Sequence, residues 1–313
     1  MATPPTISPP GSIHKLTHRT TQGEFLLRPD RFVTENFFYL LGYMQSLYSV
    51  KLHLATILSN HLHLLLTDVL GDQMGKFNTH FFSLAARGVN AFRGRRENLF
   101  NSDGVNDVMI CSHAEDLVDH GAYISANTVE AGLVSHAKKW PGINIRPSQM
   151  GNLCFEVEKP DRFYDPEGEL PDMVTVEFTI PKASDCKPEE LRQRMAEEHN
   201  RREEEKRRQM EDDGKQFLGR KAILRKSPFA RPQHELEMFA RVPHVACKDE
   251  MLRIQMLEWR KKRNRKYRLL LQSIREGTRS VILPIGTLLM HFRHGFDRDP
   301  WQGCLWEMLA ADT

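Results

Sequence analysis

The sequence predicts an α+β fold, in which a small antiparallel sheet carries helices on one face and a mainly helical, charged C-terminal extension follows. Two observations indicate this class. Between residues 13 and 131, stretches with strand-like alternation and stretches with i, i+3, i+4 apolar spacing come in the order strand, helix, strand, strand, helix, helix. After residue 148, charged residues dominate long stretches of the chain. Such stretches contribute little to a core.

The first predicted element is a hairpin, made of residues 13–19 and 25–27 on either side of a turn at Gln22-Gly23. Thr34 then caps a helix, because a side-chain hydroxyl can accept a hydrogen bond from the first turn. The apolar side of this helix consists of Phe37, Leu40, Leu41, Met44, Leu47 and Tyr48.

A strand pair follows. Residues 50–58 alternate, with Leu52, Leu54 and Thr56 on one side and Lys51, His53, Ala55 and Ile57 on the other. Ser59-Asn60 breaks the pattern, and residues 61–67 continue as the second strand.

Two helices complete this first region. Residues 73–92 end at the basic turn Arg93-Gly94-Arg95-Arg96, and their apolar face is made of Met74, Phe77, Phe81, Leu84, Ala85 and Val89. Residues 114–131 form the next helix. It ends at Gly132, because glycine readily adopts the left-handed conformation that terminates helices.

The remainder of the chain is predicted to be a connector and a charged extension. The connector, residues 149–184, contains a strand at 174–180. Residues 185–214 hold 8 basic and 11 acidic residues and almost no apolar ones, so we expect a solvated helix or linker rich in ion pairs. A helix at 248–276 carries an apolar stripe, and the apolar run at 280–292 is predicted to be a strand pair.

Several protein classes are excluded. No apolar run approaches the roughly 18 residues of a membrane span. The proline-rich start of the chain lacks the features of a signal peptide, and residues 1–12 are expected to be a disordered leader. The five cysteines are odd in number and widely spaced, which argues against a disulfide framework or a zinc knuckle and favours a reducing cytoplasm.

His61 and His63 are the first candidate site residues. Positions i and i+2 of a strand point to the same face, so the two imidazoles would lie side by side about 7 Å apart at Cα. Neutral imidazoles bind Mn²⁺ or Zn²⁺ and tolerate Mg²⁺ when oxygen ligands complete the shell. The alternative is two polar residues on the solvent face of a half-buried strand. Spacing alone favours that alternative.

Tyr123 and Asn127 are the second pair. At helical spacing i, i+4 they share one face, so a phenol and an amide oxygen could supply a nucleophile and a third metal ligand. Alternatively, Tyr123 is an aromatic residue at the edge of the core and Asn127 a polar residue at a helix end.

Taken together, these residues resemble a known family, the single-tyrosine HUH transposases, and within it the REP-associated tyrosine transposases and their longer bacterial relatives. The resemblance covers about residues 12–145 and includes the region 19–28. The matching segments are Asn60-His61-Leu62-His63-Leu64-Leu65, Tyr123-Ile124, Asn127, Val129, Ala131-Gly132-Leu133-Val134 and Trp140-Pro141. Relatives usually have Asn-Pro where this chain has Asn127-Thr128.

The resemblance implies a ferredoxin-like nuclease domain, here residues 13–148, that acts on single-stranded or hairpin DNA in a bacterial, nucleoid-associated setting. It also implies that His61, His63 and Asn127 bind Mg²⁺ or Mn²⁺. Tyr123 would attack a phosphate to form a 5′-phosphotyrosine and leave a 3′-OH. Some relatives take the tyrosine helix from a partner subunit, so a homodimer is one assembly that the resemblance allows.

Two basic clusters are candidates for DNA phosphate contacts. Residues 220–275 hold 16 basic and 5 acidic residues, an excess typical of a surface that binds a polyanion. This region belongs to the charged extension, which is predicted to consist of a linker at 185–247 and a basic helix and hairpin at 248–313. Its candidate residues are Arg260, Lys261, Lys262, Arg263, Arg265 and Lys266. The second cluster is the basic turn with Arg93, Arg95 and Arg96. A solvated helix face is the alternative for such a charge run.

Two other functions stay open on the sequence alone. One is a non-catalytic protein that keeps the fold and binds nucleic-acid hairpins. The other is a metal-dependent phosphodiesterase that uses water in place of Tyr123. Four further histidines are expected to have structural or surface roles: His14, His18, His53 and His120.

Overall fold

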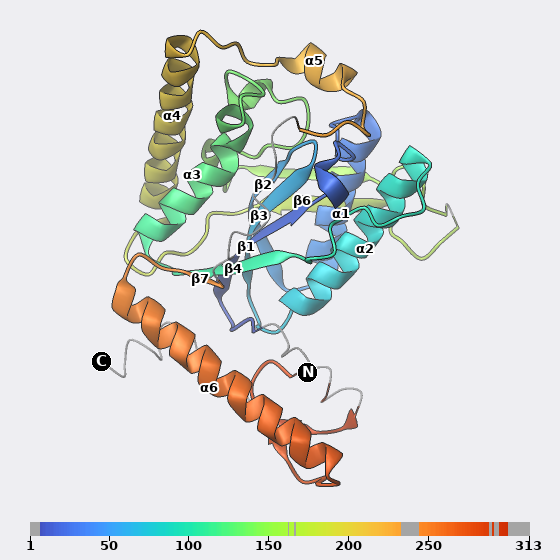
Figure 1. Cartoon of the computed structure of the whole chain (residues 1–313), viewed down its shortest axis with the longest axis vertical. Coiled ribbons are helices and arrows are strands. Elements are labelled where there is room, and N and C mark those ends of the chain that lie inside the picture. Colours follow the sequence, from blue (N-terminus) through green and yellow to red (C-terminus); the bar gives the residue numbers. More distant parts are fainter. Residues whose placement is uncertain are drawn as a thin grey trace.

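The computed structural model describes residues 7–161, 163–165, 167–232, 244–287, 290 and 294–299. Its centre is a sheet with the strand order β5-β6-β2-β3-β1-β4-β7 (Figure 1). Most neighbours are antiparallel, whereas β2 pairs with β6 and β4 pairs with β7 in parallel. The predicted α+β class with a mainly antiparallel sheet is confirmed.

The middle of the sheet has the ferredoxin-like βαββαβ order. Its elements are β1 (Ser12–Arg19), α1 (Arg31–Leu47), β2 (Val50–Ile57), β3 (His61–Asp68), α2 (Met74–Arg93) and β4 (Asn106–Ile110). The predicted helices and the strand pair agree with these elements to within a few residues. The strand β4 was not predicted, because its sequence gives five residues with little alternation.

Helices α1 and α2 cover one face of this sheet. Phe37 of α1 and Phe81 of α2 are fully buried and contact each other, with ring centroids 5.9 Å apart. His18 of β1 points to the same face, where its ring lies between Phe82 at 4.7 Å and Phe100 at 4.4 Å. Burial lowers the pKa of His18 to about 4, so the ring is a neutral part of the core.

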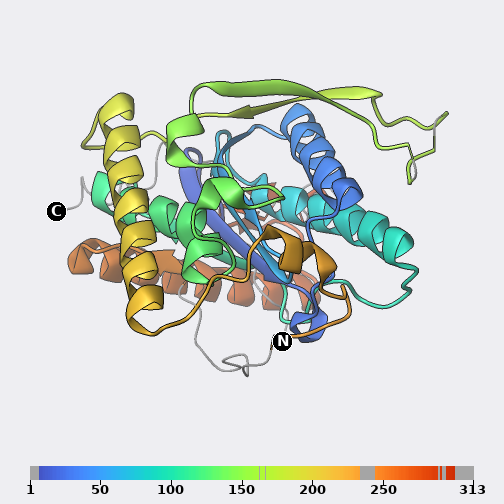
Figure 2. The same ribbon diagram turned by 90° about the horizontal axis from the view of Figure 1, so that it is seen from above.

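The opposite face is covered by α3 (Ala114–Glu130), with α4 (Pro188–Asp212) packed outside it (Figure 2). Helices therefore lie on both faces of the sheet and not on one face as predicted: α1 and α2 cover one face, and α3, with α4 outside it, covers the other. The residues predicted to be a solvated helix or linker at 185–214 form α4, which is helical as expected. One stripe of α4 is nevertheless buried against α3 and consists of Leu191, Met195, His199, Glu203 and Met210.

A β-bulge interrupts β2. Leu52 is paired with Leu66 and Leu54 with Leu65, so the two leucines point to opposite faces and not to one face as the alternation predicted. The extra residue, His53, is buried and hydrogen-bonded to the carbonyl oxygen of Thr179 at 2.9 Å and to Thr67 Oγ1 at 2.7 Å. These bonds hold the bulge in place.

The predicted N-terminal hairpin is wrong. β1 pairs with β3 on one edge and β4 on the other, so no edge is left for residues 25–27. A 3-10 turn (Thr21–Gly23) leads into that segment, whose Leu26 and Leu27 are fully buried. Residues 1–6 of the predicted leader lie outside the described residues. Ile7 and Ser8 are buried, and Ser8 Oγ donates to Asp68 Oδ2 at 2.6 Å.

The rest of the chain extends the sheet at both edges. The two short 3-10 segments after α3 are η2 (Ala137–Lys139) and η3 (Pro147–Gln149); the remaining elements are β5 (Leu153–Glu158), β6 (Met173–Phe178), α5 (Arg220–Arg225), β7 (Val245–Ala246), α6 (Glu250–Arg275), β8 (Ile282–Leu283) and β9 (Asp297–Arg298). β6 and α6 confirm two predictions. The strand pair predicted for 280–292 lies partly outside the described residues, and its β8 pairs in parallel with β9.

None of the helices in the described part of the chain combines the length and the apolar composition needed to span a bilayer.

Candidate active site

The two predicted metal-binding histidines lie on the α3 side of the central strand β3. His61 and His63 point to the same face, and their ring centroids are 4.9 Å apart. Arg19 and Thr17 of β1 stand directly opposite them in the antiparallel register. The spacing argument therefore holds, because no bulge interrupts β3 between the two residues.

Each imidazole is oriented by a hydrogen bond through Nδ1. His63 Nδ1 is 2.8 Å from Thr17 Oγ1, and His61 Nδ1 is 2.8 Å from Asn60 Oδ1. His63 Nε2 is buried and has no hydrogen-bond partner among the described residues. With the proton on Nδ1, this nitrogen presents an unshared electron pair to the site. Such an arrangement is typical of a metal-binding histidine held by a neighbouring group.

Both rings are kept neutral. Burial, together with the charge of Arg19, lowers the pKa of His61 to about 4, against a weaker opposing effect of its hydrogen bond with Asn127. Burial and the nearby His61, Lys15 and Arg19 hold the pKa of His63 well below its usual value. The neutral imidazole is the form that binds metals, so this environment fits the predicted role.

Tyr123 and Asn127 of α3 reach the same place. The ring centroid of Tyr123 is 5.6 Å from that of His63. Asn127 is buried and lies close enough to His61 and Tyr123 to affect the pKa of both. All four predicted residues therefore meet within one chain. Tyr123 lies beside the histidines of its own subunit, which differs from the arrangement that would need a partner.

Thr128 occupies the position at which the HUH transposases that the sequence resembles usually have proline. Its side chain is fully buried, and its Oγ1 accepts a hydrogen bond from Asn144 Nδ2 at 3.0 Å. Asn144 also forms a β-bridge with Thr56, next to the site face of β2. Thr128 thus fastens the last turn of α3 to the sheet and keeps Asn127 in position.

Three charged or titratable residues complete the site, and the sequence analysis did not assign them to it. Lys15 Nζ lies 5.3 Å from the centre of the Tyr123 ring and donates to His120 Nδ1 at 3.2 Å. Burial lowers the pKa of Lys15 and lowers that of His120 to about 4. Arg19 is exposed beside His61. For Lys15 and Arg19, the signal in the sequence was their i, i+2 spacing with Thr17 on a strand next to β3.

The pKa of the Tyr123 phenol is raised, mainly by burial and also by the charge of Glu130. The hydrogen bond with Asn127 and the charges of Arg19 and Arg202 act in the opposite direction. A phenol of this kind is protonated at neutral pH and needs a nearby positive charge before it can react.

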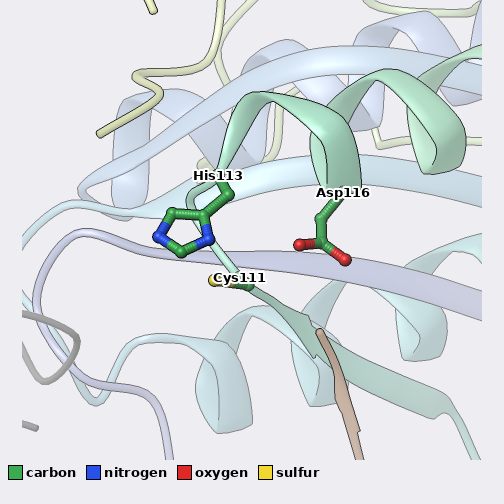
Figure 3. A group of neighbouring side chains, drawn as sticks. All are labelled: Cys111, His113 and Asp116. Atoms are coloured by element: carbon green, nitrogen blue, oxygen red, sulfur yellow. The ribbon is translucent and has the colours of Figure 1, made fainter. Parts of the chain in front are cut away.

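The site offers two imidazole nitrogens and the side-chain oxygen of Asn127 to a divalent metal. The orphaned Nε2 of His63 and the neutral state of both rings fit such an ion. A different group, Cys111, His113 and Asp116, also has ligand atoms that all lie within 4.8 Å of one another (Figure 3). It lies at the start of α3, whereas Tyr123 lies further along that helix.

The predicted basic turn after α2 is mostly engaged in ion pairs. Arg93 is buried, pairs with Asp30 and donates to the carbonyl oxygen of Leu26 at 3.2 Å. Arg95 pairs with Glu24 at 3.0 Å. Of the three arginines, Arg96 alone is exposed. Arg93 and Arg95 therefore fasten residues 24–30 to α2.

The predicted cluster on α6 is also divided. Arg263 is buried and donates to the carbonyl oxygen of Ile285 at 2.7 Å, and Lys266 pairs with Asp299 at 2.8 Å. Burial lowers the pKa of Arg260, and the charge of Asp107 acts in the opposite direction. Lys261, Lys262 and Arg265 are exposed and form no ion pair among the described residues, whereas Lys266 is exposed but paired.

A basic surface that the sequence analysis missed lies around α5. We name it the α5 basic surface, and it consists of Lys138, Lys139, Arg220, Lys221, Arg225 and Lys226. All six side chains are exposed, and none forms an ion pair among the described residues. Two adjoining hollows of about 610 and 680 Å³ follow it, and Phe217 lines one of them.

This surface adjoins the end of β3 that carries the histidines. Arg28 Nη1 donates to the carbonyl oxygen of Lys226 at 2.8 Å, and the N–H of Phe25 donates to that of Ala230 at 2.9 Å. In the same loop, the N–H of Leu27 donates to Ser59, two residues before His61, at 2.8 Å. α6 lies at the other end of the sheet in Figure 1.

Comparison with known proteins gave no matching family model and no matching curated protein. A solved structure of a REP-associated tyrosine transposase bound to a REP hairpin is similar to part of this chain, with 17% sequence identity and a TM-score of 0.37. The similarity covers 45% of this chain and 81% of that one. At that TM-score it does not establish a family for this chain.

Proposed function

We propose that this protein is a metal-dependent single-strand DNA endonuclease and strand transferase that forms a 5′-phosphotyrosine intermediate. One observation carries the proposal: two neutral imidazoles on β3, the amide of Asn127 and the phenol of Tyr123 meet on one face of the sheet. The resemblance of these same residues to the HUH transposases supports it.

His61, His63 and Asn127 would hold the metal, which we propose to be Mg²⁺ or Mn²⁺. When bound, it would polarise the scissile phosphate and offset negative charge on the phosphate oxygens. The hydrogen bonds from Nδ1 to Asn60 and Thr17 hold the two rings with their other nitrogens available.

Tyr123 would be the nucleophile. Its Oη forms a bond to the phosphorus, the bond between phosphorus and the 3′-oxygen breaks, and the phenolic proton leaves to solvent. The 3′-oxygen gains a proton and departs as a 3′-OH. Attack by a 3′-OH on the phosphotyrosine reverses the step and joins two strands, so cleavage and transfer use the same group.

Lys15 and Arg19 would support this step by charge. Lys15 lies over the Tyr123 ring, where a cation favours the phenolate over the phenol. Arg19 is exposed at the open side of His61, so it can contact a phosphate oxygen.

We further propose that the α5 basic surface guides the DNA strand to this site. Its unpaired cations supply affinity for phosphates without sequence preference, and Phe217 offers a face on which a base can stack.

The test uses a labelled single-stranded hairpin oligonucleotide with Mn²⁺ or Mg²⁺. The wild type should yield a protein–DNA adduct that survives denaturation, and Tyr123→Phe should abolish the adduct while hairpin binding is retained. The matched control is Tyr43→Phe, which replaces a tyrosine of α1 on the other side of the sheet and should leave the adduct intact.

Two results would contradict the proposal. Cleavage that persists in Tyr123→Phe would favour attack by water, as in a metal-dependent phosphodiesterase. Hairpin binding by the wild type without cleavage in either metal would favour a non-catalytic binding protein.

A further inference from the structure

A second polar cluster lies at the junction between the ferredoxin-like core and α6, away from Tyr123. Cys111 directly follows β4 and Cys247 directly follows β7. The two strands are parallel, with Ile110 beside Ala246, and the N–H of Cys111 donates to the carbonyl oxygen of Ala246 at 2.9 Å. The next positions in this register are the two cysteines, and both belong to one small buried cluster with Met109, Val245 and Met256.

His113 and Asp116 bring two more ligand atoms to the sulfur of Cys111. The ligand atoms of Cys111, His113 and Asp116 all lie within 4.8 Å of one another, and Figure 3 shows the three side chains converging. Cys111, Asp116 and Cys247 are 0%, 3% and 5% exposed. Two sulfurs, one imidazole nitrogen and one carboxylate oxygen form a set of the kind that binds Zn²⁺ tetrahedrally, and thiolates disfavour Mg²⁺ or Mn²⁺.

Each of the two cysteines stands two residues before the N-terminal cap of a helix. His113 is the N-cap of α3 and Asp249 the N-cap of α6. The positive ends of two helix dipoles therefore meet at the cluster, where they favour negatively charged ligands.

Asp116 is a buried carboxylate in need of a cation. Its Oδ1 accepts a hydrogen bond from the N–H of Lys248 at 2.9 Å, but it forms no ion pair with a lysine or arginine among the described residues. A buried carboxylate without an opposite charge beside it is costly. A bound divalent cation would provide that charge.

We propose that Cys111, His113, Asp116 and Cys247 bind one structural Zn²⁺ ion, which fastens the start of α6 to the end of β4 and the beginning of α3. The four ligands leave no open position, as is usual for a structural zinc site. The ion joins residues more than a hundred positions apart in the sequence, so it stabilises the attachment of the charged extension.

The test is the zinc content of the full chain, purified under reducing conditions without chelators and dialysed after addition of ZnCl₂. About one zinc per chain is expected by mass spectrometry in the wild type and in His61→Ala/His63→Ala. At least a tenfold loss is expected in Cys111→Ser/Cys247→Ser and in Asp116→Asn. Cys154→Ser, which changes an exposed cysteine, is the control and should keep the metal.

A second measurement does not depend on the variants folding. Co²⁺ added to the metal-free wild type should give a thiolate-to-cobalt absorption band, and chelation should accelerate hydrogen exchange at least tenfold in the first turn of α6. A wild type without zinc or cobalt binding would overturn the proposal, as would a disulfide between Cys111 and Cys247 in its place. Neither readout depends on DNA cleavage.

Discussion

At the scale of one residue, burial determines the protonation state of His63. Its ring is almost fully buried, so protonation is costly and the pKa falls well below the usual value. Thr17 holds Nδ1, which leaves Nε2 buried without a partner among the described residues. A buried nitrogen without a partner costs stability, and such a cost is typical of a position kept for binding.

Lys15 provides a prediction at this scale. Lys15→Met removes the cation near the Tyr123 ring but keeps a side chain of similar length. The phenolate then loses stabilisation, so the rate of adduct formation should fall about 10- to 100-fold at neutral pH. The pH–rate profile should also move to higher pH, because the phenol becomes harder to deprotonate. Single-turnover kinetics over a pH series measure both effects.

Lys51→Met is the control for this experiment, since Lys51 is an exposed lysine on β2. It should leave the rate and the pH profile unchanged. An equal rate loss in both variants would mean that Lys15 acts only through the overall charge of the protein.

At the scale of elements, the pairing of α3 with α4 determines where Tyr123 lies. Gly121 allows the close approach, because a Cβ there would overlap the side chain of Met195. One turn later, Ser125 Oγ is 2.9 Å from His199 Nδ1 of α4. Arg202 of α4 pairs with Asp119 and Glu130, which lie on either side of Tyr123 in the sequence of α3.

Glu203 provides the prediction for this pair of helices. Burial favours its protonated form, yet hydrogen bonds from His199, the N–H of Ala137 and Arg207 prevail and lower its pKa from 4.5 to about 2. Its carboxylate therefore stabilises the fold fully above pH 4.5, and this contribution is lost as the pH falls through about 2. Glu203→Gln should lower the free energy of unfolding by about 2 kcal/mol at neutral pH.

The control is Glu204→Gln, a change at a half-exposed glutamate of the same helix. Denaturant unfolding at several pH values should show that the loss caused by Glu203→Gln shrinks towards pH 2, whereas Glu204→Gln has little effect at any pH. A loss that is independent of pH would mean that Glu203 stabilises the fold through packing and not through its charge.

For the whole molecule, the positive charge is divided between two ends. The α5 basic surface adjoins the end of β3 that carries His61, and the basic helix α6 lies at the other end of the sheet (Figure 1). A DNA strand that reaches Tyr123 would therefore contact the α5 side first.

Replacing Arg220, Lys221, Arg225 and Lys226 by Gln should weaken hairpin binding and reduce the salt dependence of the affinity. Each lost phosphate contact removes about 0.7 from the slope of log K against log salt for a single strand, so four contacts account for about 3. Binding titrations at several salt concentrations measure the slope.

A matched variant on α6 replaces Lys261, Lys262 and Arg265 by Gln. It should change the slope much less, because α6 lies at the other end of the sheet from α5 (Figure 1). A larger effect from the α6 variant would place the DNA on the α6 side and contradict the proposed path.

The sequence by itself determined the parts that depend on local pattern. Helical spacing located α1, α2, α3 and α6 to within a few residues. Strand alternation placed His61 and His63 on one face of a strand, and helical periodicity placed Tyr123 and Asn127 on one face of a helix. These predictions hold because each depends only on residues near in the chain.

Only the tertiary structure decided what those faces meet. The register of β1 against β3 brings Lys15 and Arg19 to the site, and the parallel pairing of β4 with β7 brings Cys247 to Cys111. The bulge at His53 makes Leu52 and Leu54 point to opposite faces of the sheet. The helix α4 buries one stripe of side chains, although its sequence is almost entirely charged and polar. Contacts between residues far apart in the chain depend on strand pairing and on packing, and neither leaves a periodic signal in the sequence.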